Sequence, residues 1–317
     1  MSLTTGKWVG GLAHWRDEET RTAFLSIAFT WKINDGKRLA EYYAGLGYRV
    51  KAGGIGLAQE IFWSDFQRFA EIELRTTSDG KVLGDGTLPD AVAKHNPLAT
   101  TASRGCPVNC WFCCVPFVEG TDFTFLPDFE PRPILTDNNL SALPAHYQQH
   151  IVDRYVAEGV ILRDANSGFE PKTFDDEVFE RWKPINKGPW RFALDETGEL
   201  DDASRAIAML RRRGVSSRRI QVYTMIGHEP FAQCMERIER VIALGGEPYV
   251  QPVMKLNARV KKPWVRHDWT PKLLGQVQRW ANRHNWRKVP FAEYNSSIKT
   301  HSRAQRQPHS DLFTEAA

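Results

Sequence analysis

The chain has 317 residues, of which 42% are hydrophobic and 25% charged, and its formal net charge is +4. This length and composition suit a globular protein with one large α/β domain or two smaller ones. No run approaches the ~20 apolar residues that a membrane-spanning helix needs, and the segment Met1 to Arg16 is too polar for a secretory signal. The sequence therefore argues against a membrane protein and predicts a cytoplasmic one.

Residues 1–95 form the first predicted domain. The apolar run Phe24 to Phe29 predicts a buried strand, Gly36 to Leu46 a helix, and Tyr48 to Lys51 a second strand. This order predicts a small Rossmann-like unit. The segment Gly53-Gly54-Ile55-Gly56 is too short for a dinucleotide site and predicts a tight turn.

Residues 96–255 alternate short apolar runs with amphipathic stretches. Helical spacing predicts helices over 203–213 and 231–244. Strands that alternate with helices predict a parallel sheet, either open or curved into a barrel. The runs predicted as strands are Ile134–Thr136, Gly159–Leu162, Arg191–Leu194, Ile220–Met225 and Tyr249–Val253.

Residues 256–317 form the third predicted region. It contains the basic stretch Arg259 to Pro263, a predicted helix from Pro271 to His284, and a polar tail from Ser296 that we expect to be flexible. Its cationic side chains could approach a nucleic-acid backbone or could form a solvated helical face. Nucleic acid is therefore one candidate partner.

Four of the five cysteines lie between Cys106 and Cys114, which indicates metal or redox chemistry rather than a disulfide scaffold. Cys106, Cys110 and Cys113 have the spacing C-x3-C-x2-C and supply three thiolates from one loop. Three thiolates leave one iron of a four-iron cluster open to a small molecule. A structural zinc site, the alternative, normally has four closed ligands. We expect Cys114 and Cys234 to be packing residues.

The segment Thr101 to Cys114, with Phe112 directly before the third cysteine of the motif, resembles the signature of the radical S-adenosylmethionine (SAM) superfamily. Its flanking Ser-Arg-Gly and Val-Pro are typical of members with an N-terminal cobalamin-binding or methylthiotransferase-type domain. The resemblance covers roughly residues 96–255. It implies an α/β fold with a partial (βα)6 barrel after the Rossmann-like domain, and a 4Fe-4S cluster on the three cysteines.

The resemblance also implies a reaction. The enzyme would cleave SAM reductively and generate a 5′-deoxyadenosyl radical that modifies a substrate the sequence does not identify. Its electrons would come from a donor such as flavodoxin or ferredoxin. The alternative is a non-catalytic nucleic-acid-binding protein whose cysteines hold a structural metal.

Polar residues after the strand predicted at 134–136 are candidate cofactor contacts. By resemblance, Asp137 and either Asn138 or Asn139 correspond to a short motif that binds the amino group of SAM, although the usual Gly-Gly-Glu is absent. The alternative is an Asx-turn that begins a helix.

Further candidate contacts follow later strands. Glu170 corresponds to a ribose-binding carboxylate of related proteins, or is simply a surface charge. Ile226 and Gly227 resemble a late apolar–glycine motif that packs the adenine. Asp195 ends another predicted strand and could reach the cofactor or the substrate.

Residues 1–95 carry no motif for a second cofactor. The only histidines there are His14 and His95, and neither lies in a D-x-H-x-x-G cobalamin loop. The segment also contains no cysteine for a second cluster. We therefore expect this domain to keep the shape of a cobalamin-type domain without its cofactor.

Overall fold

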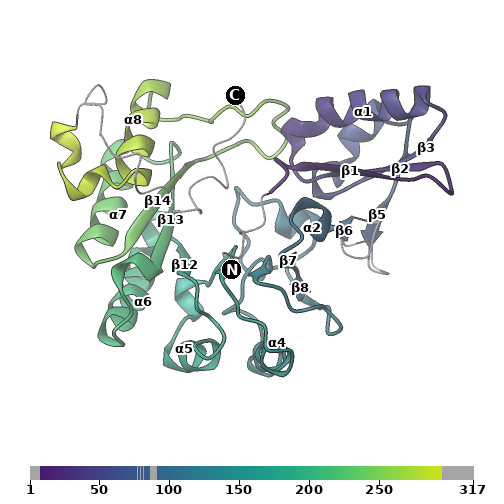
Figure 1. Ribbon diagram of the computed structural model, residues 1–317. Helices are drawn as coiled ribbons and strands as arrows, with labels where there is room; N and C mark the ends of the chain where they lie inside the picture. Colours follow the sequence, from purple (N-terminus) through teal and green to yellow (C-terminus); the bar gives the residue numbers. More distant parts are fainter. Residues whose placement is uncertain (1–7, 77, 79, 81, 86–90, 295–317) are drawn as a thin grey trace. The chain divides into compact units, whose positions relative to one another are not determined.

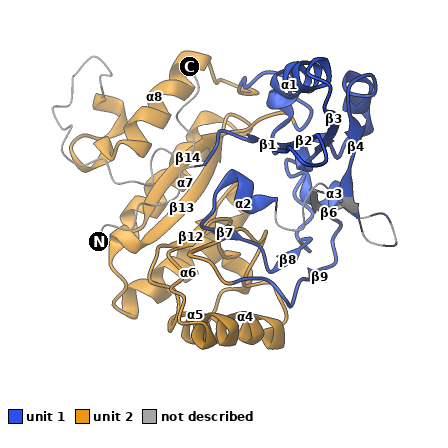
Figure 2. Cartoon of the chain, turned by 45° about the vertical axis from the view of Figure 1, so that its right-hand side comes forward, with its two compact units in different colours: residues 1–130, 256–262, 311–317 blue, residues 131–255, 263–310 orange. Residues whose placement is uncertain are grey.

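The computed structural model describes residues 8–294 except 77, 79, 81 and 86–90. The chain divides into two compact units, 1–130 with 256–262 and 311–317, and 131–255 with 263–310 (Figure 2). The three-part division made from the sequence stays a prediction. The tail from Ser296 lies outside the described residues.

The first unit is built on a four-stranded sheet with the order β1-β2-β3-β4 (Figure 1). β1 pairs antiparallel with β2, whereas β2, β3 and β4 run parallel. Helix α1 connects β2 to β3, so the predicted strand, helix and second strand are confirmed. The bounds are β1 Leu12–Asp17, β2 Thr22–Ile27, α1 Ile33–Gly45, β3 Arg49–Gly53 and β4 Glu71–Ile72.

The glycine-rich turn after β3 fits closely against the end of β2. Gly54 has φ +100°, and a Cβ atom there would lie 2.4 Å from the carbonyl oxygen of Ile27. A Cβ at Gly56 would lie 2.9 Å from the same oxygen. Only glycine permits this approach of two backbones. Packing therefore explains the glycines, in line with the predicted tight turn.

Shorter elements complete the first unit. β5 pairs antiparallel with β6, and β8 pairs antiparallel with β9. The bounds are β5 Leu74–Thr76, β6 Val82–Asp85, α2 Val92–His95, β7 Ala99–Thr100, β8 Ser103–Arg104, α3 Val115–Val118 and β9 Thr124–Phe125.

The second unit consists of parallel strands joined by helices. β10 pairs with β11, and β12, β13 and β14 form a three-stranded parallel sheet in that order. The described strands show a mixed α/β fold with parallel sheets, as predicted, and no closed barrel. The bounds are β10 Ile134–Leu135, α4 Ala145–Ala157, β11 Asp164–Ala165, α5 Asp176–Trp182, β12 Trp190–Ala193, α6 Leu200–Arg212, β13 Ile220–Ile226, α7 Phe231–Ala243, β14 Glu247–Pro252 and α8 Pro271–Asn282.

The strand predicted over Gly159–Leu162 is wrong. Gly159 follows the end of α4 with φ +65°, so the chain is still turning there. Leu162 makes only an isolated bridge to Asn186, and β11 begins at Asp164. Of this run only Leu162 is buried, and Ile161 is 45% exposed.

One face of the β12–β14 sheet is apolar and is covered by helices (Figure 1). Ile226 and Val250 pack against side chains of α7 and α8 in one core cluster. On β12, Trp190 and Phe192 join an aromatic group with residues of the preceding loop and helix, among them Phe174, whose ring centroid is 4.9 Å from that of Phe192. This packing removes large apolar side chains of the second unit from water.

The other face of this sheet is polar. Because side chains alternate along a strand, Arg191 and Tyr223 point away from the apolar cluster. The guanidinium of Arg191 pairs with Asp164 of β11 at 2.9 Å and also donates to the Tyr223 hydroxyl. The Tyr223 and Tyr249 rings meet edge to face, with centroids 5.2 Å apart. The sheet therefore has a dry side under the helices and a hydrogen-bonding side.

No helix in the described parts of the chain combines the length and the apolar character needed to cross a bilayer.

We expect Phe174→Ala to lower the free energy of unfolding by about 3–5 kcal/mol, because it opens a cavity in the aromatic group. Phe117→Ala is the matched control, since Phe117 is 72% exposed and its truncation should cost less than about 0.5 kcal/mol. Urea unfolding followed by circular dichroism measures both. Equal losses in the two variants would contradict the packing argument.

Candidate functional site

The cysteine motif lies in a loop that a short antiparallel pair closes at its base. Arg104 of β8 lies opposite Thr124 of β9, so the chain leaves and returns at the same point. Inside the loop, the amide of Cys106 donates to the Gly120 carbonyl at 3.2 Å, and the amide of Cys113 donates to the Cys110 carbonyl at 3.1 Å. The backbone thus places Cys110 and Cys113 on one turn and ties Cys106 to the end of the loop at Gly120.

A buried carboxylate, Glu119, fixes the start of this loop. The side chain is 2% exposed; its Oε2 accepts a hydrogen bond from the Gly105 amide at 2.9 Å, and its Oε1 lies 3.6 Å from Nη1 of Arg104. Gly105 has φ +87°, and a Cβ atom there would lie 2.1 Å from the Asp122 carbonyl oxygen. Glycine is therefore required directly before the first cysteine of the motif.

The donor set of the loop fits a 4Fe-4S cluster. Within the described residues, no three His, Cys, Asp or Glu side chains gather closely enough to coordinate one metal ion. A cubane does not require such convergence, because each thiolate binds a different iron. Cys114 directly precedes α3, and burial raises the pKa of its thiol to about 11, with Cys113 adding to the effect. The cluster ligands Cys106, Cys110 and Cys113 stay a prediction.

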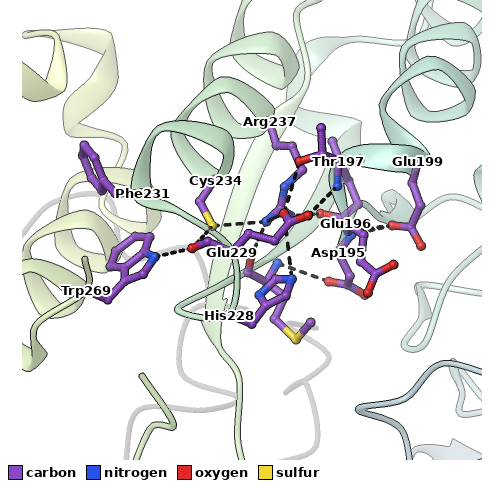
Figure 3. Close-up of polar contacts among 12 residues, drawn as sticks. Asp195, Glu196, Thr197, Glu199, His228, Glu229, Phe231, Cys234, Arg237 and Trp269 are labelled. Atoms are coloured by element: carbon purple, nitrogen blue, oxygen red, sulfur yellow. Dashed lines mark hydrogen bonds and ion pairs between the residues drawn. The ribbon is translucent and has the colours of Figure 1, made fainter. Parts of the chain in front are cut away.

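A second group of polar side chains lies at the C-terminal ends of β12 and β13 (Figure 3). This edge is the usual place of ligand sites in parallel α/β sheets. Asp195 follows β12, and its Oδ1 accepts a hydrogen bond from the Met225 amide of β13 at 3.2 Å. Its own amide donates to Oε2 of Glu199 at 2.6 Å. Asp195 thus bridges two adjacent strand ends, and its Oδ2 has no hydrogen-bond partner among the residues described.

Carboxyl groups at this edge hold their protons more tightly than usual. Burial raises the pKa of Asp195 to about 7, and the Glu199 carboxylate adds to the rise. Burial likewise raises the pKa of Glu170, with a further contribution from Glu199. A carboxyl that is partly protonated near neutral pH can donate a hydrogen bond or a proton to a ligand.

A fully buried arginine holds the two strand ends in place. Arg237 of α7 is 0% exposed and donates to the carbonyls of Leu194 at 2.6 Å and Met225 at 2.9 Å. It also pairs with Oε2 of Glu229 at 2.9 Å. The Glu229 carboxylate in turn accepts hydrogen bonds from the amide and the hydroxyl of Thr197, both at 3.2 Å. Arg237 and Glu229 therefore connect the loop after β12 to the loop after β13.

The structure places Asp137 and Asn139 among buried residues and leaves Asn138 half-buried. The Asn139 side chain accepts a hydrogen bond from the Ala142 amide at 3.2 Å. That bond agrees with the turn alternative for Asn139. The negative charge of Asp137 contributes to the raised pKa of Tyr155, after burial as the main cause. A cofactor role for Asp137, Asn138 and Asn139 stays a prediction.

Ile226 and Gly227 lie at the end of β13. The Ile226 side chain is fully buried in the core cluster, so only its backbone lies at the edge of the sheet. Gly227 has φ +97°, and its carbonyl accepts a hydrogen bond from the Arg266 amide at 2.8 Å. These residues and Glu170 belong to the second unit, whereas the cysteine loop belongs to the first.

Sequence reasoning missed Arg237 and Glu229. The signal was present in the spacing of α7, since position 237 lies between the buried Cys234 and Val241, on the inward side of the helix. An arginine at an inward position needs a buried acceptor set. Here the acceptors are two strand-end carbonyls and Glu229.

No protein-family model matches the chain, and no curated protein sequence matches it.

Gly105→Ala should loosen the cysteine loop, because the new methyl group would collide with the Asp122 carbonyl. Gly214→Ala is the matched control: Gly214 also has positive φ, but a Cβ there meets nothing within 4 Å. The control should cost about 1–2 kcal/mol, the penalty for the left-handed conformation alone. Hydrogen exchange at the Cys106 amide should accelerate only in Gly105→Ala. Unchanged protection there would contradict the role given to Gly105.

Asp195→Asn should remove a pH dependence of stability. The carboxyl has pKa about 7 in the folded chain against an ordinary value of 3.8. Its stabilising contribution to the free energy of unfolding is therefore complete below about pH 4 and is lost as the pH rises through 7. The reason is that the folded state holds the proton that the unfolded state releases. Asparagine mimics the protonated acid, so the variant should gain stability relative to the unmodified protein between pH 5 and pH 8. Urea titrations at pH 5 and pH 8 measure the free energy of unfolding, with the exposed Asp201→Asn as control. The same change with pH in both variants would refute the prediction.

Proposed function

We propose that the protein is a radical SAM enzyme, with a 4Fe-4S cluster on Cys106, Cys110 and Cys113. The observation that carries the proposal is the cysteine loop. Three cysteines with C-x3-C-x2-C spacing lie in one loop, and Glu119 and Gly105 fix the start of that loop. When bound, the cluster would supply the electron for reductive cleavage of SAM into methionine and a 5′-deoxyadenosyl radical.

The second unit supports this proposal through its parallel strands. Strands and helices alternate from β10 to β14, which is the order that a partial (βα)6 barrel of this superfamily would use. Polar groups follow the strands at their C-terminal ends, where Glu170 and Gly227 are the proposed SAM contacts. Asp137, Asn138, Asn139 and Ile226 complete that proposed set.

The residues of the chain have separate tasks in this proposal. The loop holds the thiolates, and Arg237 with Glu229 keeps the two strand-end loops in register so that Gly227 can lie close to a ligand. Asp195 can hold a proton at Oδ2 and present it to a bound hydroxyl or carbonyl group. A protein donor of the flavodoxin or ferredoxin type would deliver the electron in the cell.

Anaerobic reconstitution with iron and sulfide tests the proposal. We expect about four irons and four sulfides per chain, a cluster signal in electron paramagnetic resonance after reduction with dithionite, and formation of 5′-deoxyadenosine from SAM. Stoichiometric zinc without SAM cleavage would instead favour the alternative, a nucleic-acid-binding protein with a structural metal.

Two cysteine variants sharpen this test. Cys110→Ala removes a proposed ligand and should abolish both the cluster signal and 5′-deoxyadenosine formation. Cys114→Ala, one residue beyond the motif, should retain most of the iron and the activity. Iron content, the resonance signal and product chromatography measure the difference. Equal loss in both variants would contradict the three-ligand assignment.

A further inference from the structure

Two cations flank one tryptophan in the second unit. The Nζ atom of Lys255 lies 5.9 Å and the Cζ atom of Arg266 5.2 Å from the ring centroid of Trp264. Cations attracted to an indole face keep their charge while losing conformational freedom. Trp264 therefore holds the two charged groups in place before any ligand arrives.

These residues lie at the C-terminal edge of the β12–β14 sheet. The Val253 amide donates to the Ile226 carbonyl at 3.0 Å, the Trp264 amide to the Val253 carbonyl at 2.9 Å, and the Arg266 amide to the Gly227 carbonyl at 2.8 Å. The chain thus returns beside the ends of β13 and β14. This places Arg266 next to Gly227, at the edge where parallel sheets bind ligands.

The two charges are available to a ligand. Lys255 and Arg266 are exposed, and neither forms an ion pair with any residue that the structure describes. The nearby Asp268 accepts a hydrogen bond from the Phe231 amide at the start of α7. Two exposed cations at a ligand-binding edge attract an anion.

We propose that Lys255 and Arg266 bind a phosphate group of the substrate. The proposal rests on the proposed function, since it names the substrate class of that enzyme. The planar guanidinium presents paired donors that match phosphate oxygens, and lysine contributes a point charge to the same group. Two unpaired cations also suit the charge of a phosphate better than that of a single carboxylate.

The phosphate could belong to a nucleic-acid backbone or to a small phosphorylated molecule. A nucleic-acid backbone offers many phosphates in a row, whereas a small molecule offers few. Both sources share the chemistry at Lys255 and Arg266, so the experiment compares them directly.

The test is a binding measurement with the full-length, cluster-reconstituted protein. Fluorescence anisotropy reports on a labelled single-stranded RNA of about 20 nucleotides, long enough to offer many phosphates, and calorimetry reports on pyrophosphate. The double variant Lys255→Glu with Arg266→Glu should weaken binding at least about tenfold, because two charge-assisted contacts are lost. The dependence of log affinity on log salt should become less steep by about two.

The matched control is Arg212→Glu with Arg218→Glu. Both residues are exposed near the start of β13, at the opposite edge of the same sheet, and the change in net charge is identical. The control should bind as the unmodified protein does, and circular dichroism checks that both variants fold. Equal weakening in the two variants, or no binding of either probe to the unmodified protein, would overturn the proposal.

The remaining outcomes identify the phosphate source. RNA binding that depends on Lys255 and Arg266 supports the site with a polymer as ligand. Pyrophosphate binding with the same dependence, but without RNA binding, supports it with a small molecule as ligand. Because the readout is binding, its failure leaves SAM cleavage unaffected, and failed SAM cleavage leaves the phosphate site intact.

Discussion

One buried guanidinium, that of Arg237, holds together the edge of the sheet on which the second unit's candidate site is built. A charge without solvent contact is costly unless its hydrogen bonds are satisfied. Arg237 meets this condition at both Nη atoms, which donate to the carbonyls of Leu194 and Met225 and pair with the carboxylate of Glu229. The acceptors come from the ends of β12 and β13 and from the loop after β13. The helix, both strands and both loops can therefore shift only together.

The same charge shapes the electrostatics of the edge. Arg237 lowers the pKa of Asp195, yet burial and the Glu199 carboxylate outweigh it, and the pKa of Asp195 still rises to about 7. The reason is that Arg237 directs its donors to two carbonyls and to Glu229, whereas Asp195 accepts from a neutral amide. A proton-holding carboxyl thus lies near a permanent cation without being neutralised by it.

The cysteine loop of the first unit is also held by a buried charged side chain, but there the charge is negative. There a buried carboxylate, Glu119, accepts from the Gly105 amide and lies near the Arg104 guanidinium. In each unit a buried ionic group thus forms hydrogen bonds with the backbone of a loop or strand end. Loops of this kind carry functional residues because their scaffold, and not their own secondary structure, holds them.

Sequence patterns predicted the strands β12 to β14 and the helices packed on them, because these elements carry clear periodicity. Helices α6 and α7 and strands β12, β13 and β14 lie within a few residues of their predicted bounds. The strand expected at 159–162 failed because the chain is still turning at Gly159 after the end of α4. β1 was missed because its side chains, Leu12 to Asp17, alternate too weakly in polarity.

The candidate sites were less predictable, for a different physical reason. The cysteine motif could be read directly, because its three cysteines sit close together in the chain. Arg237 and Glu229 could not, because their partners come from separate strand ends that only the fold brings together. Lys255 and Arg266 could be recognised in the sequence as cationic residues. Their position relative to Gly227 depends on the hydrogen bond from the Arg266 amide to the Gly227 carbonyl, which no sequence pattern predicts.

The C-terminal edge of the β12–β14 sheet carries acidic groups at one end and basic groups at the other. Carboxyl groups, among them Asp195 and Glu199, cluster where β12 ends. The exposed cations Lys255 and Arg266 lie where β13 and β14 end, with Gly227 between the two groups along the strand order. A ligand with a phosphate at one end and neutral hydrogen-bonding groups at the other meets opposite fields across a single sheet edge. Its phosphate is repelled at β12 and attracted at β14. The direction in which such a molecule binds is then set by charge before any close contact forms.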